Sequence, residues 1–410
     1  MTTKKNAPHK THAHTHERNT VNETKTEKIA DPTATRSGVK KILIFGGKGG
    51  VGKSSIATST AVWLADQMPD KRILLISFDV AHNLGDILDM EIGSRLTNVT
   101  ENLTAIEPDP DRFARKYARE LQDKMTQFVK NSIFIQKLDG LKQFFLKMFD
   151  PQNLPLGQKN ALFFNQLLEG EIEGRPETGF DYIVADFPPT ANMIALFEAP
   201  MEQDHQFVRF ALDAFRAIHE KFVKVESIYR ILHPISSRRV EKNNDDLTQE
   251  VFDCMNRLDE KTARTARVLK ALGSIRLVSI AEKASVEEAK RAYDLANSYV
   301  PVDGLHVNRM IPGKLEGSMD FLDAMITMQR KYLSQARDFC QSKGIGTFSS
   351  HLLDGEPIGM DGIRRLGEEI YGDVRISEML EPKVRAHVRS AGKKLKMKEG
   401  RKNAEVEAEL

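Results

Sequence analysis

An apolar run passes directly into a glycine-rich turn in the segment Ile42-Leu43-Ile44-Phe45-Gly46-Gly47-Lys48-Gly49-Gly50-Val51-Gly52-Lys53-Ser54-Ser55. The apolar residues are typical of a buried strand, and the residues that follow Lys53 have the spacing of a helix. Glycines permit the positive φ angles that bring successive backbone N–H groups around an anion, and the start of a helix adds its positive dipole end. The turn matches the pattern G-x-x-x-x-G-K-[ST] and predicts a nucleotide-binding P-loop, with a merely flexible glycine loop as the alternative.

The residues of this loop predict a site for ATP and Mg²⁺. Lys53 would place its charge at the β- and γ-phosphates, and the Ser54 hydroxyl is placed to bind Mg²⁺. We expect nucleotide contacts from the consecutive residues Gly47, Lys48, Gly49, Gly50, Val51, Gly52, Lys53, Ser54 and Ser55.

A second lysine, Lys48, lies inside the loop and makes it resemble the deviant Walker A loop of the ParA, MinD and ArsA class of ATPases. In that class the early lysine reaches across a dimer interface to the partner's nucleotide. The resemblance implies a homodimer in which Lys48 is catalytic, since a cation there can neutralise charge on the transferring phosphoryl group. The alternative is a solvated loop lysine.

Composition excludes several classes of protein. A net charge of +2 over 410 residues argues against nucleic-acid binding along the whole chain. The two cysteines, Cys254 and Cys340, are far apart and can form neither a disulfide framework nor a CxxC metal site within one chain, which suits a reducing compartment. No run approaches the roughly 18 apolar residues of a transmembrane helix. We therefore expect a cytoplasmic protein without a transmembrane segment.

Strand-like runs alternate with helical segments along the chain. They lie at 42–45, 72–77, 103–107, 181–186, 275–280, 304–308 and 346–348. This alternation predicts an α/β fold with a doubly wound, mostly parallel sheet. The P-loop ATPase core would comprise residues 39–110, 175–200 and 273–375, and the helical stretches 111–174 and 201–272 would form an inserted α-helical subdomain at the carboxyl ends of the strands.

The two ends of the chain have the composition of tails. Residues 1–38 are polar and poor in large apolar side chains, which predicts disorder. Four histidines there, at 9, 12, 14 and 16, either bind a metal weakly or are solvated. Residues 376–410 are predicted as a basic, charged tail, which either docks on anionic lipid or RNA or is solvated.

Dense apolar residues mark two helical regions. The first is rich in phenylalanine and predicts either a core or a flexible apolar groove for helical ligands; it contains Phe128, Ile133, Phe134, Ile135, Leu138, Leu141, Phe144, Phe145, Met148 and Phe149. The second is a stripe on one long helix and consists of Phe321, Met325, Met328, Tyr332, Ala336 and Phe339.

Four segments together resemble the arsenical-pump ATPase (ArsA) family, and within it the branch that targets tail-anchored membrane proteins. The P-loop is the first segment. Residues 79–86 look like the family's first switch, with Val80 where proline is usual. Residues 186–196 resemble the second switch, with Ala191-Asn192-Met193 in place of glycine, histidine and threonine. Residues 279–282 together with 307–309 look like the adenosine-binding elements.

The resemblance implies roles for individual residues. Asp79 would orient the attacking water, although a structural cap on the next turn is the alternative. Asp186 would hold Mg²⁺ together with Ser54, Asn308 would contact the adenine, and Glu282 would lie at the dimer-facing edge. No zinc is expected, because Met319 and Leu322 occupy the positions of the family's zinc-binding CxxC and cannot bind zinc.

Three functions fit this pattern. The first is an ATP-hydrolysing targeting factor that binds the transmembrane helices of tail-anchored proteins in a nucleotide-gated groove and meets a membrane receptor. The second is the ATPase of an arsenite efflux pump, disfavoured by the shortage of thiols and by the single P-loop. The third is a MinD- or ParA-type positioning ATPase, disfavoured by the two long helical insertions.

Overall fold

The computed structural model describes residues 38–79, 84–131, 139–148, 150–154, 156–170, 179–189, 193, 213–217, 220–221 and 238–382. The strands described there form one sheet in the order β3-β4-β2-β5-β1-β6-β7-β8. They are β1 Lys41–Gly47, β2 Ile73–Ser77, β3 Thr97–Asn98, β4 Leu103–Ile106, β5 Tyr182–Asp186, β6 Gly273–Ile280, β7 Val302–Met310 and β8 Gly346–His351. Among the described strands, β3 alone pairs antiparallel, with β4. The predicted doubly wound, mostly parallel α/β fold is confirmed; the edge strand β3 was not predicted.

Strand β1 lies between β5 and β6, where the order of the strands along the sheet reverses. Its side chains alternate, so that Ile42 and Ile44 join the hydrophobic core on one face, and Leu43 and Phe45 join the core on the other. Ligands of open α/β sheets bind at the carboxyl ends of the strands at such a reversal. The carboxyl end of β1 is Gly47, the first residue of the predicted P-loop.

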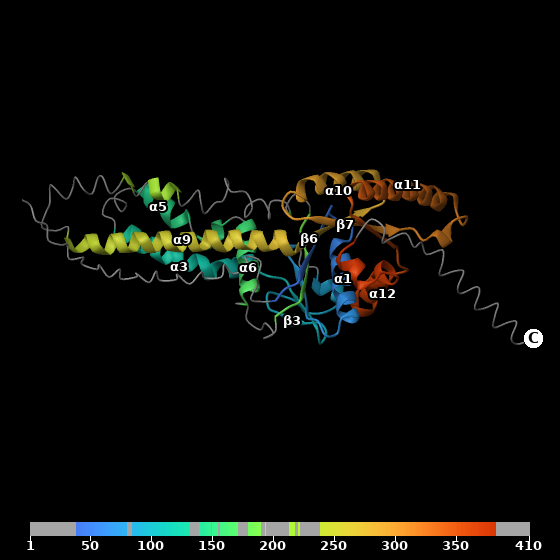
Figure 1. The fold of residues 1–410 in the computed structure, drawn as a ribbon, viewed down its shortest axis with the longest axis horizontal. Helices are drawn as coiled ribbons and strands as arrows, with labels where there is room; N and C mark the ends of the chain where they lie inside the picture. The colour runs from blue at the N-terminus through green and yellow to red at the C-terminus, as the bar shows by residue number, and fades with distance from the viewer. Residues whose placement is uncertain are drawn as a thin grey trace, which may run out of the picture.

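Helices cover both faces of the sheet (Figure 1). On one face are α1 Lys53–Gln67, α2 Leu84–Leu88, α12 Gly359–Tyr371 and α13 Ile376–Leu380. On the other are α6 Leu156–Glu169, α10 Lys283–Ala296, α11 Asp320–Lys343 and the end of α9 Arg238–Leu272. The short 3₁₀ helices are η1 Pro151–Asn153 and η2 Gly313–Leu315. No helix in the described part of the chain is long and apolar enough to cross a bilayer.

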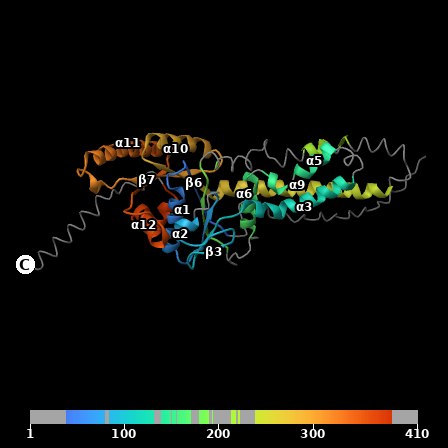
Figure 2. The same cartoon turned by 180° about the vertical axis from the view of Figure 1, so that it is seen from behind.

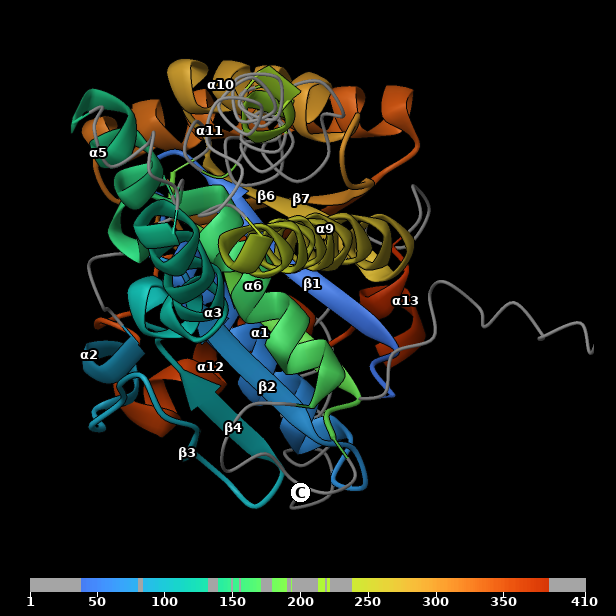
Figure 3. The same cartoon turned by 90° about the vertical axis from the view of Figure 1, so that its left-hand side faces the viewer.

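The long helices α3 Pro110–Asn131 and α9 extend away from the sheet together with α5 Asp139–Met148 (Figure 2). They share a hydrophobic cluster of their own, separate from the two cores that flank the sheet. We predicted that the helical stretches 111–174 and 201–272 lie at the carboxyl ends of the strands. In the structure, α6 and the end of α9, which belong to these stretches, lie across one face of the sheet (Figure 3). The reason is that Phe163, Phe164, Leu167 and Leu168 of α6 complete the sheet's core.

The phenylalanine-rich region divides between core and surface. Phe128 is buried beside Phe215, with ring centroids 5.1 Å apart, and Phe215 also meets Phe252 at 5.0 Å. By contrast, 41% of Phe144 on α5 is exposed. Residues 133–138 and 149, and the side chains of residues 141, 145 and 148, lie outside the described part. The buried Phe128 therefore fits the core interpretation, and the exposed Phe144 fits the groove interpretation.

The apolar stripe predicted on α11 is wrong for two of its members. Phe321 is 67% exposed and Met328 is 38% exposed. The residues of α11 that are buried are Ile326, Gln329, Ala336 and Cys340. The face of α11 that packs on the sheet is therefore not the face that carries its largest apolar side chains. The packed face includes Gln329, so it is less hydrophobic in sequence than the face that was predicted to be buried.

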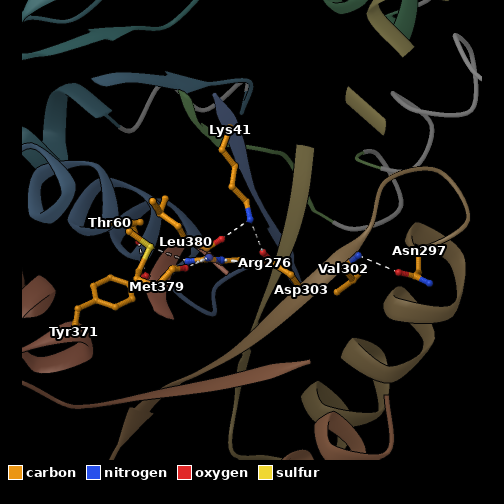
Figure 4. A network of polar contacts seen from close by, with 9 residues as sticks. All are labelled: Lys41, Thr60, Arg276, Asn297, Val302, Asp303, Tyr371, Met379 and Leu380. Carbon is orange, nitrogen blue, oxygen red and sulfur yellow. Dashed lines mark hydrogen bonds and ion pairs between the residues drawn. The ribbon is translucent and has the colours of Figure 1, made fainter. Parts of the chain in front are cut away.

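The amino-terminal edge of the sheet is fastened by a buried cation (Figure 4). Arg276 of β6 is fully buried; its Nη2 donates to the Met379 carbonyl and its Nε lies 3.3 Å from Asp303 Oδ1. Lys41 of β1 donates to the Leu380 carbonyl and lies 3.4 Å from Asp303 Oδ2, and burial lowers its pKa. Residues 376–382 are thus part of the folded core and not of the predicted charged tail, because a helix C-terminus attracts cations.

Truncation after Arg375 should destabilise the protein by about 3 kcal/mol or more, because it removes the Met379 carbonyl from the buried Arg276 and the Leu380 carbonyl from Lys41. Truncation after Pro382 keeps α13 and serves as the matched control. Urea unfolding followed by circular dichroism measures both. Equal unfolding midpoints for the two truncations would show that the contacts of α13 contribute nothing.

Candidate nucleotide-binding site

The loop between β1 and α1 has a backbone that only glycine fits at two positions. Gly47 has φ +147°, and a Cβ there would lie 2.2 Å from the Val278 carbonyl oxygen of β6. Gly52 has φ +88°, and a Cβ there would lie 2.4 Å from Asn308 Nδ2 of β7. Glycine is therefore required both by the left-handed backbone and by the close approach of two neighbouring strands. The loop has the wrapped form expected of a P-loop.

The two lysines of the loop have different environments. Lys53 begins α1 and is only 6% exposed, and its Nζ donates to the Lys48 carbonyl at 3.2 Å. Lys48 itself is exposed. The ammonium group of Lys53 is thus held inside the curve of the loop, where a phosphate would sit, whereas the side chain of Lys48 is available to a group outside it.

Asp186 ends β5 next to the P-loop and pairs in register with Phe45 of β1 and Ser77 of β2. It is fully buried, and burial raises the pKa of its carboxyl group to about 7. Hydrogen bonding by Ser54 and Ser77 and the charge of Lys53 oppose this rise, while the charge of Asp79 adds to it. The Ser77 hydroxyl donates to Oδ2 at 3.4 Å, and Oδ1 has no hydrogen-bond partner among the described residues.

This environment fits a magnesium ion. The hydroxyl of Ser54 is an oxygen ligand of the kind that Mg²⁺ prefers, and the open oxygen of the buried Asp186 carboxylate can accept from a water of the hydrated ion, which keeps waters and phosphate oxygens as its other ligands. The cation would also neutralise a carboxylate that burial destabilises. The assignment of Ser54 and Asp186 to Mg²⁺ remains a prediction.

Asp79 lies just beyond the end of β2, half-buried, and its backbone N–H donates to Ser77 Oγ at 3.2 Å. Because its charge affects the pKa of Asp186, the two carboxylates share one edge of the sheet. Residues 80–83 of the first switch, and residues 190–192 and 194–196 of the second, lie outside the described part. The part of the first switch that follows begins α2, where the Leu84 N–H donates to the buried carboxylate of Glu107 at 2.8 Å.

The two predicted adenosine-side residues differ. Asn308 of β7 donates from Nδ2 to the Val51 carbonyl at 2.9 Å, and its Oδ1 accepts from Ser350 at 2.7 Å and from the Arg309 N–H at 2.9 Å. It therefore braces the P-loop, a role that the sequence did not indicate. Glu282 is exposed at the N-cap position of α10. Contacts of either residue with nucleotide remain predictions.

An open groove of about 970 Å³ lies beside α2, away from the P-loop. Its lining includes the carboxylates of Asp86, Asp89, Glu91, Glu107 and Asp109. Such a lining repels the phosphates of a nucleotide. The predicted phosphate site, at the N–H groups and lysines of the loop, is therefore distinct from this groove.

The model of the family described as anion-transporting ATPase (ArsA ATPase) matches residues 40–372. The chain belongs to the ArsA ATPase family. It is therefore an ATPase, and P-loop ATPases use Mg²⁺ with their nucleotide.

Relatives of this ArsA-family chain carry two kinds of name. It is 26% identical to a putative arsenical pump-driving ATPase of Prosthecochloris vibrioformis, over 84% of this chain and 79% of that protein. It is 27% identical to ATPase GET3 of Eremothecium gossypii, over 79% of this chain and 87% of that protein. It is 32% identical to the arsenical pump-driving ATPase of Escherichia coli, over 40% of this chain but only 26% of that protein. Identity alone does not separate the two kinds.

Asp186→Asn should stabilise the nucleotide-free ATPase. The folded protein keeps the Asp186 proton up to about pH 7, whereas the unfolded chain releases it near pH 3.8, so the ionised carboxylate costs folding free energy above pH 4. This cost grows up to about pH 7 and is then constant at up to about 4 kcal/mol. Urea unfolding from pH 4 to 8 should show the variant's advantage increasing with pH.

The same substitution should weaken Mg²⁺-dependent nucleotide binding, because a neutral amide attracts a hydrated magnesium ion less strongly than a carboxylate does. Titration of ATP with and without Mg²⁺ measures this. A variant no more stable than the parent at pH 8, or one that keeps the full effect of Mg²⁺ on ATP affinity, would contradict the assignment.

Proposed function

We propose that this ATPase is a cytoplasmic, homodimeric targeting factor. In this proposal ATP binding and hydrolysis open and close an apolar groove between the long helices, and the groove takes the transmembrane helix of a tail-anchored membrane protein for delivery to a membrane receptor. The likeness to ATPase GET3 over most of both chains supports it. The predicted helical segments 111–174 and 201–272 would form the client-binding part.

The observation that carries this proposal is an aromatic cluster between the nucleotide site and the helical layer. Phe78 precedes Asp79, and Phe187 follows Asp186; their ring centroids are 4.9 Å apart. On α6, Phe164 lies 5.1 Å from Phe78 and Phe163 lies 5.7 Å from it. Asp79 and Asp186 therefore each have a phenylalanine next to them in the sequence, and the rings of these two phenylalanines pack together with α6.

The cluster continues into α3, because Phe163 also meets Phe113 at 4.8 Å. Close-packed rings cannot move independently, so a shift of the strand ends when nucleotide changes must be accommodated by α6 and α3. The bistable packing of such an interface is a known means of converting a small displacement into a larger one. This connects the state of the nucleotide to the helices that would form the groove.

The proposed hydrolysis needs few residues. Backbone N–H groups of residues 49–53 and the charge of Lys53 would hold the phosphates, Ser54 would bind Mg²⁺ directly, and Asp186 would bind it through water. Asp79 would orient the attacking water at the same edge of the sheet. Positioning and charge neutralisation account for most of the catalysis of phosphoryl transfer. These residues supply both effects.

A homodimer would supply Lys48 of each protomer to the nucleotide of the other. The exposed position of Lys48 and the apolar side chains exposed near the start of α11 support this; the latter are Leu315, Met319, Phe321 and Met328. Buried apolar area is the usual source of stability for an obligate interface. Zinc is not needed in this arrangement.

Lys48→Ala should lower kcat by about 10³-fold while changing ATP affinity little, because a cation in trans acts mainly on the transition state. Steady-state ATPase assays and ATP titration measure the two quantities. Mixing Lys48→Ala protomers with Asp79→Asn protomers should restore activity in part, since one site of the mixed dimer is intact. Unchanged turnover in Lys48→Ala would exclude contact across a dimer.

The arsenite-pump alternative rests on the names of several relatives. Arsenic(III) binds clusters of thiolates. Both cysteines of this chain are free and buried, on α9 and α11, and burial raises the pKa of each thiol to about 11. Protonated, buried thiols are poor ligands at neutral pH. The MinD- or ParA-type alternative is weaker, since that class lacks helices such as α3 and α9, which are 22 and 35 residues long.

A client-capture experiment tests the targeting proposal. Asp79→Asn protein should retain ATP without turnover and should crosslink to a photoreactive transmembrane helix of a tail-anchored protein. Lys53→Ala, which should not bind ATP, is the control that should capture little. Failure to crosslink in the ATP state, with ATP hydrolysis stimulated by arsenite, would support the pump instead; stimulation by lipid or DNA would support a positioning ATPase.

Phe164→Leu refines this test, because it removes one ring of the aromatic cluster and leaves an apolar side chain that is only slightly smaller. It should leave ATP hydrolysis intact and reduce the difference in capture between the ATP and ADP states. Phe339→Leu removes a ring contact with Tyr293 far from this cluster and serves as the matched control.

A further inference from the structure

The carboxyl end of β7 contains a strained residue next to the P-loop. Arg309 has φ +58°, and Asp89 is the only other non-glycine residue with positive φ in the described ranges. The pairing of β7 with β8 shifts between Val307 and Met310, so that two residues of β7 lie opposite the single Ser350 of β8. This is a β-bulge, which bends a strand and re-aims its side chains. Left-handed backbone at a residue such as arginine costs free energy and persists only where its surroundings hold it.

Gln329 of α11 holds this bulge in place. Its Oε1 accepts from the Ile311 N–H at 2.8 Å, and its Nε2 donates to the Arg309 carbonyl at 3.3 Å. The side chain is 8% exposed and belongs to the buried row of α11. Both ends of the amide are thus used on the two sides of Met310, which fixes the course of the backbone there.

The bulge directs two side chains at successive carbonyls of the P-loop. Asn308 donates to the Val51 carbonyl at 2.9 Å, and Arg309 donates from Nη1 to the Gly50 carbonyl at 3.0 Å. Peptide groups are planar, and no cis peptide occurs among the described residues, so each N–H points opposite to the C=O of its own peptide group. Because Asn308 and Arg309 hold the carbonyls of Val51 and Gly50 toward β7, the N–H groups of Gly52 and Val51 point away from β7, toward the inside of the loop.

We propose that Arg309, positioned by Gln329, is a positioning residue of the ATPase that orients the Val51 and Gly52 N–H donors toward the phosphates of the bound nucleotide. The proposal rests on residues 47–54 being the nucleotide site. A preorganised loop does not lose conformational freedom when the nucleotide arrives, so the contribution of Arg309 is to nucleotide affinity. It acts from outside the loop and does not contact the reacting atoms.

Arg309→Ala should therefore weaken the binding of ATP and of ADP equally, by about fivefold to tenfold, the loss expected for one ordinary hydrogen bond. The value of kcat should stay unchanged while KM rises by the same factor. Arg309→Lys should restore part of the affinity, since a lysine ammonium can reach the same carbonyl. Calorimetric titration of ATP and ADP, with steady-state kinetics, measures these quantities on the full chain.

Two further variants separate the side chain from the backbone. Arg309→Gly removes the strain together with the guanidinium, so it should lose affinity like Arg309→Ala while unfolding at a temperature no lower than the parent. Arg364→Ala on α12, which removes an exposed arginine paired with Asp66, should leave affinity unchanged. Unaltered ATP and ADP affinity in Arg309→Ala, or a fall in kcat at constant affinity, would overturn the proposal.

Lys53→Ala distinguishes this outcome from failure of the site assignment. If Lys53→Ala abolishes binding and Arg309→Ala does not weaken it, the loop is the nucleotide site and only the role of Arg309 is wrong. If Lys53→Ala also binds ATP normally, the site itself is misplaced.

Discussion

Asp186 is held between opposing electrostatic effects, and much of the molecule is arranged around it. Full burial favours the protonated carboxyl group, while Lys53, Ser54 and Ser77 favour the ionised form, and the result is a pKa of about 7. A carboxylate with such a pKa is close to equilibrium between two states near neutral pH, so a divalent cation can decide which of them is populated. The fold brings this about by pairing β5 with β1 on one side and β2 on the other, so that three strands end at one point.

The same strand ends connect the chemistry to the helices. In β2 and β5 the carboxylate and an aromatic residue are adjacent in sequence, so Asp79 and Asp186 face the loop edge while Phe78 and Phe187 pack with α6. In the proposed mechanism, a strand end that shifts when the nucleotide changes would move its ring as well. From its place across the sheet face, α6 contacts both rings and the core beneath them.

Much of the fold followed from local pattern, because buried parallel strands and P-loop glycines have strong signals in sequence. The positions of the loop after β1, of Asp79 and of Asp186 could be predicted, since each follows or ends a strand whose apolar run is unmistakable, while their roles stay predictions. Contacts between distant segments could not be. The roles of Gln329 and Ser350 depend on a bulge in β7, and a bulge leaves no periodic signal. The stripe on α11 was misplaced because large side chains were favoured over the row that contains Gln329.

Gln329 also shows how one helix serves two surfaces. On one face of α11 its amide fixes the backbone that carries Arg309, and on an adjacent face the preceding residue, Met328, is exposed together with Phe321. The hydrogen bond from Gln329 to the Arg309 carbonyl is 3.3 Å long, so a shift of α11 by one ångström away from β7 would break it. If Arg309 positions the P-loop as proposed, a body that bound the exposed side of α11 and shifted this helix would act on the P-loop through Gln329 and the bulge of β7.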